Sequence, residues 1–457
     1  MLHSPAPIPV APLDRSWSIL AAVLETLETA DIPYCITHGY EDLAQGVTSD
    51  VDCIVPIDVS PERLTNLLKH HRRAIGADVI RCLSGHIVLA GRNADRSPCF
   101  VDLHVGNGYE LNGHRYYSAE QILGRRRRFG ELWIPAVRLA FGCHLVRRVI
   151  KGSISDDNAR RFGDLYRQDP RGCAAEISRF WSPATAAEIR SAIERGDWKG
   201  VQNGLPRFRS ELQRRTALRR PLEPVRDQFT RLARRGSRIC WPKGGMEVIF
   251  LGPDGAGKSS VISQIGKELD GAFSSTRCLF FPPALYRRWR GRPEGPPVLP
   301  HDLPQRSVFA SVSRALAYWL AYYIAGYWIS IRPALARSAL VIHDRHLLDA
   351  LVDPRRYRYA GPAWLLRWIW LLLPKPDLVI LLDAPADVLH ARKQELPFEQ
   401  TVELMNRYRQ LVRTLRNGYA VDASLPLRDV TAAVNDIILG TLSRRFDAEE
   451  PRPDVQR

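Results

Sequence analysis

One segment restricts the architecture of this chain more than any other: a short apolar run, residues 247–251, leads directly into a glycine-rich turn and then a helix start. The turn reads Gly-Pro-Asp-Gly-Ala-Gly-Lys-Ser over residues 252–259. Its glycines let successive backbone N–H groups face one anion, while the lysine can reach outer phosphates and the serine a magnesium ion. The segment therefore predicts a strand, a phosphate-binding turn and a helix.

Residues 246–445 continue this pattern by alternating apolar and helical segments. Further strands are expected at 278–281, 339–343 and 378–382, and helices include an aromatic stretch at 315–331 and a tryptophan-rich one at 364–373. Such alternation is typical of a parallel sheet with helices on both faces, whose ligands gather at the carboxyl ends of the strands. We assign residues 241–457 to this α/β domain.

The chain before residue 241 reads differently. Residues 1–117 predict an α+β core with strands at 32–37, 51–55, 79–83, 86–90 and 99–105, and a helix over 61–73 with Ser60 as its N-cap. Residues 118–240 carry no strand signal and predict an arginine-rich helical extension and linker, with helices at 184–195 and 225–235.

Composition limits the partners and the compartment. The net charge is +16, but the arginine-rich extension holds no recognised nucleic-acid motif, so no specific nucleic-acid partner is expected. The eight cysteines lack metal-ligand spacing, which favours reduced thiols in a cytoplasmic protein. The two aromatic stretches are too short to span a membrane; core packing is favoured, and contact with a membrane surface or lipid-linked substrate is the alternative. A homodimer is left open.

Polar residues follow two further apolar strands. Asp344-Arg345-His346 comes after the strand at 340–343, and Asp383 comes after the strand at 378–382. Together with the turn at 252–259, these residues resemble the thymidylate kinase family of nucleoside monophosphate kinases, which carries G-x-D-G-A-G-K-[ST] and D-R-[YH]. The resemblance covers roughly residues 246–445. It implies a P-loop phosphotransferase that uses ATP and Mg²⁺.

The resemblance also implies roles for individual residues. Lys258 and the lid residues Arg392 and Lys393 would neutralise the transferred group, Asp344 would organise metal or acceptor, and Arg345 would hold the acceptor's phosphate. For Arg392 and Lys393 the alternative is two solvated helix charges. Ser259 would ligate Mg²⁺. The residues expected to hold the nucleotide are Gly252, Asp254, Gly255, Ala256, Gly257, Lys258, Ser259 and Ser260.

The chain departs from that family where the family holds its base. Asp349 and then Val-Asp-Pro at 352–354 replace the base-holding residues, so an acceptor other than dTMP is expected, either phosphorylated or linked to a sugar or lipid. Such an acceptor would meet Arg345 and Arg355, with Asp349 or Asp353 as base. The alternative is a nucleotide-binding switch or interaction protein whose N-terminal domain is degenerate.

A second constellation lies in the N-terminal core. Asp50 and Asp52 are two apart on one strand and so face the same way, and Asp102 lies in another apolar strand. This pattern resembles the nucleotidyltransferase superfamily, and the resemblance implies that Asp50, Asp52 and Asp102 bind Mg²⁺ and direct nucleotidyl transfer. Turn-capping aspartates in an inactive domain are the alternative. His104 is expected to be a core or supporting histidine, and the run 125–128 a solvated face.

Overall fold

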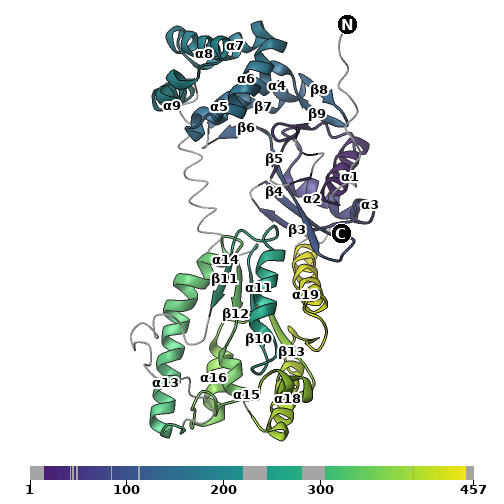
Figure 1. The fold of residues 1–457 in the computed structure, drawn as a ribbon, viewed down its shortest axis with the longest axis vertical. Helices are drawn as coiled ribbons and strands as arrows, with labels where there is room; N and C mark the ends of the chain where they lie inside the picture. The colour runs from purple at the N-terminus through teal and green to yellow at the C-terminus, as the bar shows by residue number, and fades with distance from the viewer. Residues whose placement is uncertain are drawn as a thin grey trace, which may run out of the picture. The chain divides into compact units, whose positions relative to one another are not determined.

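The structure is a computed structural model, and the chain divides into two compact units (Figure 1). Unit 1 comprises Met1–Asn93 and Cys99–Arg234, and unit 2 comprises Ala94–Pro98 and Arg235–Arg457. The structure describes residues 15–41, 43, 46–47, 50–83, 85–111, 114–219, 244–279, 304–394 and 396–448.

Unit 2 is built on a five-stranded parallel sheet, as predicted. Its strands are β10 (Met246–Leu251), β11 (Thr276–Leu279), β12 (Leu340–His343), β13 (Leu378–Asp383) and β14 (Gly418–Asp422), in the order β11-β12-β10-β13-β14. The three central strands are almost wholly buried, which explains their continuous apolar runs. β14 was not predicted, because its residues are largely half-buried or exposed and its apolar run is only three residues long.

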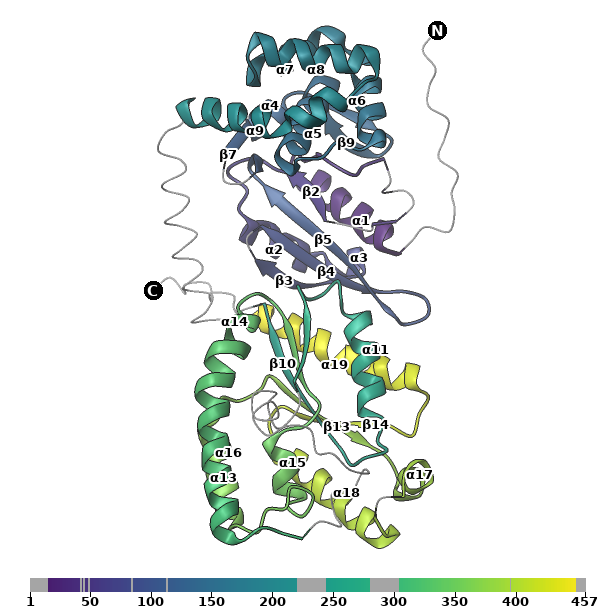
Figure 2. The ribbon, with the colours of Figure 1, turned by 60° about the vertical axis from the view of Figure 1, so that its left-hand side comes forward.

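Helices cover both faces of this sheet. α11 (Lys258–Glu268) packs against α19 (Leu427–Ala448), and α13 (Val308–Leu320) lies with α16 (Ala363–Leu372) on the other side (Figure 2). The π-helix η3 (Ala321–Ile331) and α14 (Arg332–Leu335) continue α13 toward β12. The remaining helices are α15 (Leu347–Val352), α17 (Ala386–Arg392) and α18 (Phe398–Arg413). This arrangement confirms the predicted α/β layers.

The two aromatic stretches are amphipathic helices. Tyr327 and Ile331 are buried while Trp328 and Ile329 are exposed, and α16 buries Leu365, Leu366 and Ile369 but exposes Trp364, Trp368 and Leu371. No helix in the described part of the chain is both long and apolar enough to cross a membrane.

Unit 1 contains a mixed five-stranded sheet of β1 (Cys35–Ile36), β2 (Val51–Ile54), β3 (Asp78–Leu83), β4 (His86–Arg92) and β5 (Pro98–Gly106). Their order is β1-β2-β5-β4-β3. α1 (Arg15–Thr29), α2 (Pro61–His70) and α3 (Arg72–Ile75) accompany the sheet. Ser60 caps α2 by accepting a hydrogen bond from the Arg63 N–H, as its sequence position predicted.

Two hairpins follow the five-stranded sheet. β6 (Gly108–Leu111) pairs with β7 (His114–Ser118) before the predicted extension begins. β8 (Arg126–Phe129) pairs with β9 (Leu132–Pro135), so the prediction that no strand follows residue 118 was wrong. The arginine run therefore lies in a strand, where Arg126 and Arg128 stack over the Trp133 ring at 4.6 and 4.2 Å. Their guanidinium groups cover an aromatic face, while Arg125 and Arg128 remain exposed to solvent.

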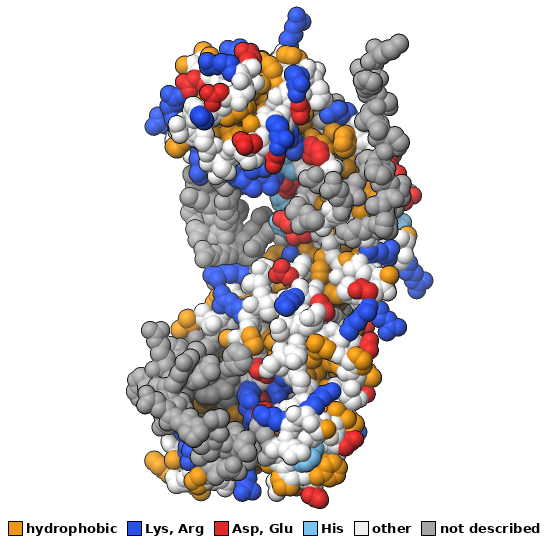
Figure 3. All heavy atoms as spheres, viewed as in Figure 1, with side chains coloured by type: hydrophobic (Ala, Val, Ile, Leu, Met, Phe, Trp, Pro, Cys, Tyr) orange, Lys and Arg blue, Asp and Glu red, His pale blue; other side chains and the backbone are white. Residues whose placement is uncertain are grey.

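The described part of the helical extension has one short helix before this hairpin and five helices after it. They are α4 (Ala119–Leu123), and then α5 (Val137–Lys151), α6 (Asp156–Gln168), α7 (Pro170–Phe180), α8 (Pro183–Arg195) and α9 (Lys199–Arg219). They share one buried core that includes Phe162, Trp181 and Phe208. The helix expected at 225–235 lies outside the described residues. On the face shown in Figure 3, basic side chains are interspersed with acidic ones.

Candidate phosphoryl-transfer site

The glycine-rich loop follows β10 and adopts the backbone that its sequence requires. Gly252, Gly255 and Gly257 have φ angles of +141°, +88° and +85°, in a region that favours glycine. A Cβ at Gly252 would lie 3.2 Å from the carbonyl oxygen of Leu382, so the loop also packs closely on β13. Gly257 is the N-cap of α11, whose first N–H groups lack partners within the helix. The loop and helix end thus form a place for an anion.

Lys258 lies folded over this loop. Its side chain is buried, and Nζ donates to the carbonyl oxygens of Gly252 at 2.5 Å and Pro253 at 3.0 Å. Burial lowers the pKa of Lys258, although nearby carboxylates such as Asp349 oppose the shift. The hydrogen bonds of this buried ammonium go to neutral carbonyl groups, so it would gain from an anionic partner at hydrogen-bond distance.

Asp254 gathers three cationic side chains from separate elements of the same unit. Its carboxylate accepts from Arg356 at 2.7 Å, Arg345 at 3.1 Å and Lys393 at 3.1 Å. Burial alone would raise the pKa of Asp254, but the guanidinium groups of Arg356 and Arg345 hold it far below its ordinary range. The carboxylate side chain is 15% exposed, so these ion pairs are only partly screened by solvent.

Asp344 follows β12 and stands beside the start of α11. It is buried, and burial raises its pKa, while Lys258, Arg345 and a hydrogen bond with the Ser259 side chain oppose that shift. A carboxylate and a hydroxyl in contact are ligands suited to Mg²⁺, which prefers oxygen donors. Ser259 and Asp344 would therefore hold the ion, as the sequence led us to expect for Ser259.

Other residues named from the sequence occupy different places. Arg392 lies at the end of α17 and donates to the carbonyl oxygen of Ala423 at 3.0 Å, whereas its neighbour Lys393 reaches Asp254. Ala256 is buried within the loop, and Ser260 is exposed on α11. Residues 281–282, a Phe-Pro pair after the predicted second strand, lie outside the described residues.

The two candidate bases take part in local structure. Asp349 accepts from the His346 backbone N–H and the Tyr408 hydroxyl, both at 2.9 Å, and burial raises its pKa. Asp353 accepts from the backbone N–H of Arg356 at 3.1 Å. Arg355 is exposed, and Arg356 is the arginine that turns inward. The sequence offered no signal that separates these two adjacent arginines.

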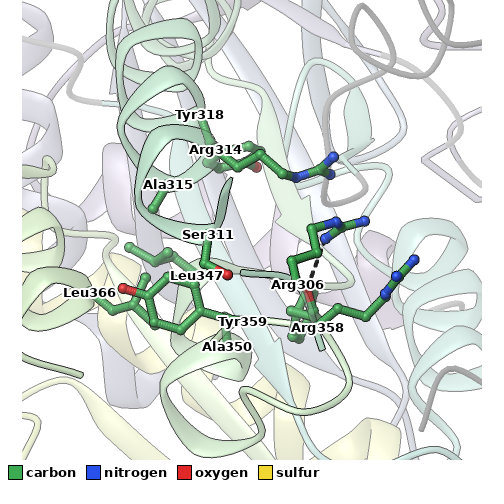
Figure 4. Close-up of a pocket in the computed structure, with 11 residues that line it drawn as sticks. Arg306, Ser311, Arg314, Ala315, Tyr318, Leu347, Ala350, Arg358, Tyr359 and Leu366 are labelled. Atoms are coloured by element: carbon green, nitrogen blue, oxygen red, sulfur yellow. Dashed lines mark hydrogen bonds between the residues drawn. The ribbon is translucent and has the colours of Figure 1, made fainter. Parts of the chain in front are cut away.

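A cavity of about 110 Å³ opens beside α13 and α15 (Figure 4). Leu347, Ala350 and Leu366 supply apolar lining, and Ser311 and Tyr359 add hydroxyl groups. Three arginines also line it, and their guanidinium groups point to one side of the view in Figure 4: Arg306, Arg314 and Arg358. Tyr357, which also lines the cavity, lies near enough to Arg345 for that guanidinium to oppose the rise that burial causes in the pKa of Tyr357. The cavity therefore adjoins the cation cluster at Asp254.

In unit 1, the structure separates Asp52 from the other two predicted metal ligands. Its oxygens lie 2.8 Å from His104 Nδ1 and 2.9 Å from an Arg147 nitrogen. Burial would raise the pKa of Asp52, but the hydrogen bonds from His104 and Arg147 outweigh it and lower that pKa well below its ordinary range. His104 thus supports Asp52. Asp102 lies with Asp50 and with His86, which the sequence analysis did not single out.

Comparisons with known proteins concern less than half of this chain. No protein-family model matches it. A probable thymidylate kinase from Pyrobaculum aerophilum is 29% identical over 202 residues, which are 42% of this chain and 95% of that protein. The crystal structure of thymidylate kinase from Ehrlichia chaffeensis aligns with 43% of this chain and 99% of that chain, at 15% identity and a TM-score of 0.31. The sequence similarity supports a nucleotide-kinase-like function for that part of the chain.

Proposed function

We propose that unit 2 transfers a phosphoryl group from ATP to a small phosphorylated acceptor. The observation that carries this proposal is the convergence of the phosphate loop, the buried Lys258, the Ser259–Asp344 pair and the cations around Asp254 at the carboxyl ends of parallel strands. Ligands of open α/β sheets bind at that edge. The similarity to a probable thymidylate kinase supports the same class of reaction.

Each group of residues in the site would have a different role in binding phosphate. Backbone N–H groups of the loop and the N-terminus of α11 would bind the donor phosphates, and Lys258 would neutralise charge on the transferred group. Arg345 and Arg356 would orient anionic oxygens by moving from Asp254 to phosphate. Mg²⁺ held by Ser259 and Asp344 would supply further shielding of the phosphate charge.

The acceptor is inferred from the carboxylates near the site. A hydroxyl acceptor needs a base, but Asp349 and Asp353 already accept hydrogen bonds within the fold. A phosphate monoester is largely dianionic at neutral pH, since its second pKa is about 6, and it needs no base to attack. The arginine-lined cavity beside Tyr357 suits the anionic part of such an acceptor, and its apolar lining suits an uncharged part.

The test is acceptor-dependent ADP release by the full chain with ATP and Mg²⁺. Phosphorylated nucleosides, sugars and lipids serve as acceptors, with dTMP among them. Lys258→Ala should lower acceptor-dependent turnover by about 100-fold. Lys267→Ala, which removes an exposed lysine from the same helix, should leave it unchanged. Slow ATP hydrolysis that no acceptor accelerates would favour the nucleotide switch instead.

Nucleotidyl transfer by unit 1 is a second candidate function. Asp50 and Asp102 lie close together, which supports this function. Asp52 does not support it, because its carboxylate is already bonded to His104 and Arg147. The test is transfer of a labelled nucleotide in wild type and in Asp102→Asn, and equal transfer by both would exclude this role for Asp102. The division into residues 1–117, 118–240 and 241–457, the homodimer and the cytoplasmic location stay predictions.

A further inference from the structure

We propose that unit 1 binds one divalent transition-metal ion, such as Mn²⁺, Co²⁺ or Zn²⁺, through Asp50, His86 and Asp102. One ligand atom of each residue lies within 4.8 Å of the others. The site differs from the all-carboxylate magnesium site predicted from the sequence, because a histidine takes the place of Asp52. It is independent of the phosphoryl transfer proposed for unit 2.

The order of the strands brings these three residues together. β2, β5 and β4 are neighbours in the sheet, and the parallel register pairs Val51 with Leu103. Asp50 and Asp102 each come one residue earlier, so they lie next to each other at the start of this pairing. His86 is the first residue of β4. Along β5 the odd-numbered residues are buried, so Asp102 points to the more open face of the sheet.

The spacing of the ligand atoms suits a metal ion. His86 Nδ1 lies 3.0 Å from Asp102 Oδ1. Two ligands that each lie about 2.1 Å from one ion are roughly 3.0 Å apart at the right angle of octahedral coordination, and about 3.4 Å apart at a tetrahedral angle. One ion could therefore bind both atoms with little movement of either side chain. Asp50 would close the set from the exposed side.

Neighbouring side chains hold the proposed ligands in place. Arg81 contacts the second oxygen of Asp102 at 3.4 Å, and the His104 ring stacks on His86 with 4.4 Å between ring centroids. His104 is itself fixed by Asp52 at 2.8 Å. Such outer contacts orient metal ligands and tune their affinity. Asp52 thus supports the site through His104 and is not a ligand.

The donor set selects the class of metal. Imidazole nitrogen suits first-row transition metals, whereas Mg²⁺ prefers oxygen ligands alone. The His86 side chain is 33% exposed, and three protein ligands leave coordination positions for water or an anionic group. The ion would therefore be accessible to small molecules from solvent.

Calorimetric titration of the chelator-treated full chain, without nucleotide, tests this proposal with Mn²⁺, Zn²⁺ and Mg²⁺. We expect one Mn²⁺ or Zn²⁺ per chain, bound at least 10-fold more tightly than Mg²⁺. Asp50→Asn and His86→Gln should each weaken binding by at least 10-fold. His114→Gln, in β7 and outside the cluster, should bind like wild type.

Two controls keep the result decisive. Asp50 is exposed, so Asp50→Asn removes the negative charge of one ligand with little effect on packing, and circular dichroism checks the fold of each variant. Ser259→Ala, which alters only the candidate magnesium site of unit 2, should retain the same stoichiometry. Wild-type affinity in both Asp50→Asn and His86→Gln would overturn the proposal, and so would binding of Mg²⁺ as tight as that of Mn²⁺.

Discussion

Adding one methyl group at each of three glycines in the phosphate loop and its helix should give three different results. Gly252 has a φ of +141° and Gly257 a φ of +85°. Gly266 lies inside α11, where an added Cβ would meet only Thr276 Cγ2 at an ordinary 3.6 Å. The same chemical change is therefore made in three different backbone environments by Gly252→Ala, Gly257→Ala and Gly266→Ala.

The expected magnitudes follow from the backbone and the free space. Gly266→Ala should stabilise unit 2 by about 0.5–1 kcal/mol, because alanine favours the helix interior. Gly257→Ala should destabilise by about 1–2 kcal/mol through its φ alone, since no atom lies within 4 Å of the new Cβ. Gly252→Ala should cost about 1–3 kcal/mol in backbone strain, with added crowding against Leu382 O at 3.2 Å and Ala256 Cβ at 3.3 Å.

Thermal unfolding and calorimetric titration with an ATP analogue measure these effects. If a strained loop leaves its binding conformation, a loss of 1–3 kcal/mol weakens nucleotide binding by roughly 5- to 150-fold. Gly266→Ala should bind the analogue like wild type. Equal stability and affinity in Gly257→Ala and Gly266→Ala would refute the claim that left-handed backbone at residue 257 is required.

Three further substitutions test single contacts. Burial raises the pKa of Asp349, so the stability that this group contributes is complete below its unfolded pKa of about 3.9 and is lost as the pH rises through its folded pKa. Wild type should therefore lose stability relative to Asp349→Asn in urea unfolding as the pH is raised above about 4, and a difference that does not change with pH would contradict this. Arg409→Lys should lower the free energy of unfolding by at most about 1 kcal/mol at neutral pH, because Arg409 contacts both oxygens of Asp383 but is partly exposed. We expect this loss in chemical unfolding at low salt and no difference from wild type in about 1 M salt, which screens the ion pair. Tyr117→Phe should destabilise unit 1 by about 1–3 kcal/mol in chemical unfolding, because the buried Glu176 carboxylate loses a donor at 2.9 Å, and unchanged stability would count against that bond.

Local features of the chain were readable from the sequence, and contacts between distant residues were not. The turn at 252–259 and the central strands of unit 2 carry their signals in consecutive residues, so periodicity and glycine spacing identified them. Arg356 and Asp254, which share a hydrogen bond, are 102 positions apart in the sequence. Arg147 and Asp52, which also share one, are 95 positions apart. Neither contact leaves a local pattern.

The unpredicted elements had a different cause. β8 is built from arginines that would normally mark a solvated face, and only its pairing with β9 and the Trp133 ring reveals its place. β14 lies at the edge of the sheet, where less burial is needed and the apolar signal is weak. Tertiary pairing, which single-sequence patterns do not encode, decides both strands.

The carboxylate of Asp254 acts as an internal counter-anion for the cations that a nucleotide would use. Arg345, Arg356 and Lys393 would otherwise repel one another across a small space, and Asp254 keeps them assembled before any ligand arrives. An entering phosphate must therefore compete for these side chains, and the net affinity is the difference between two sets of ion pairs. On release of that phosphate, the cations would pair with Asp254 again, so no buried charge would be left without a partner.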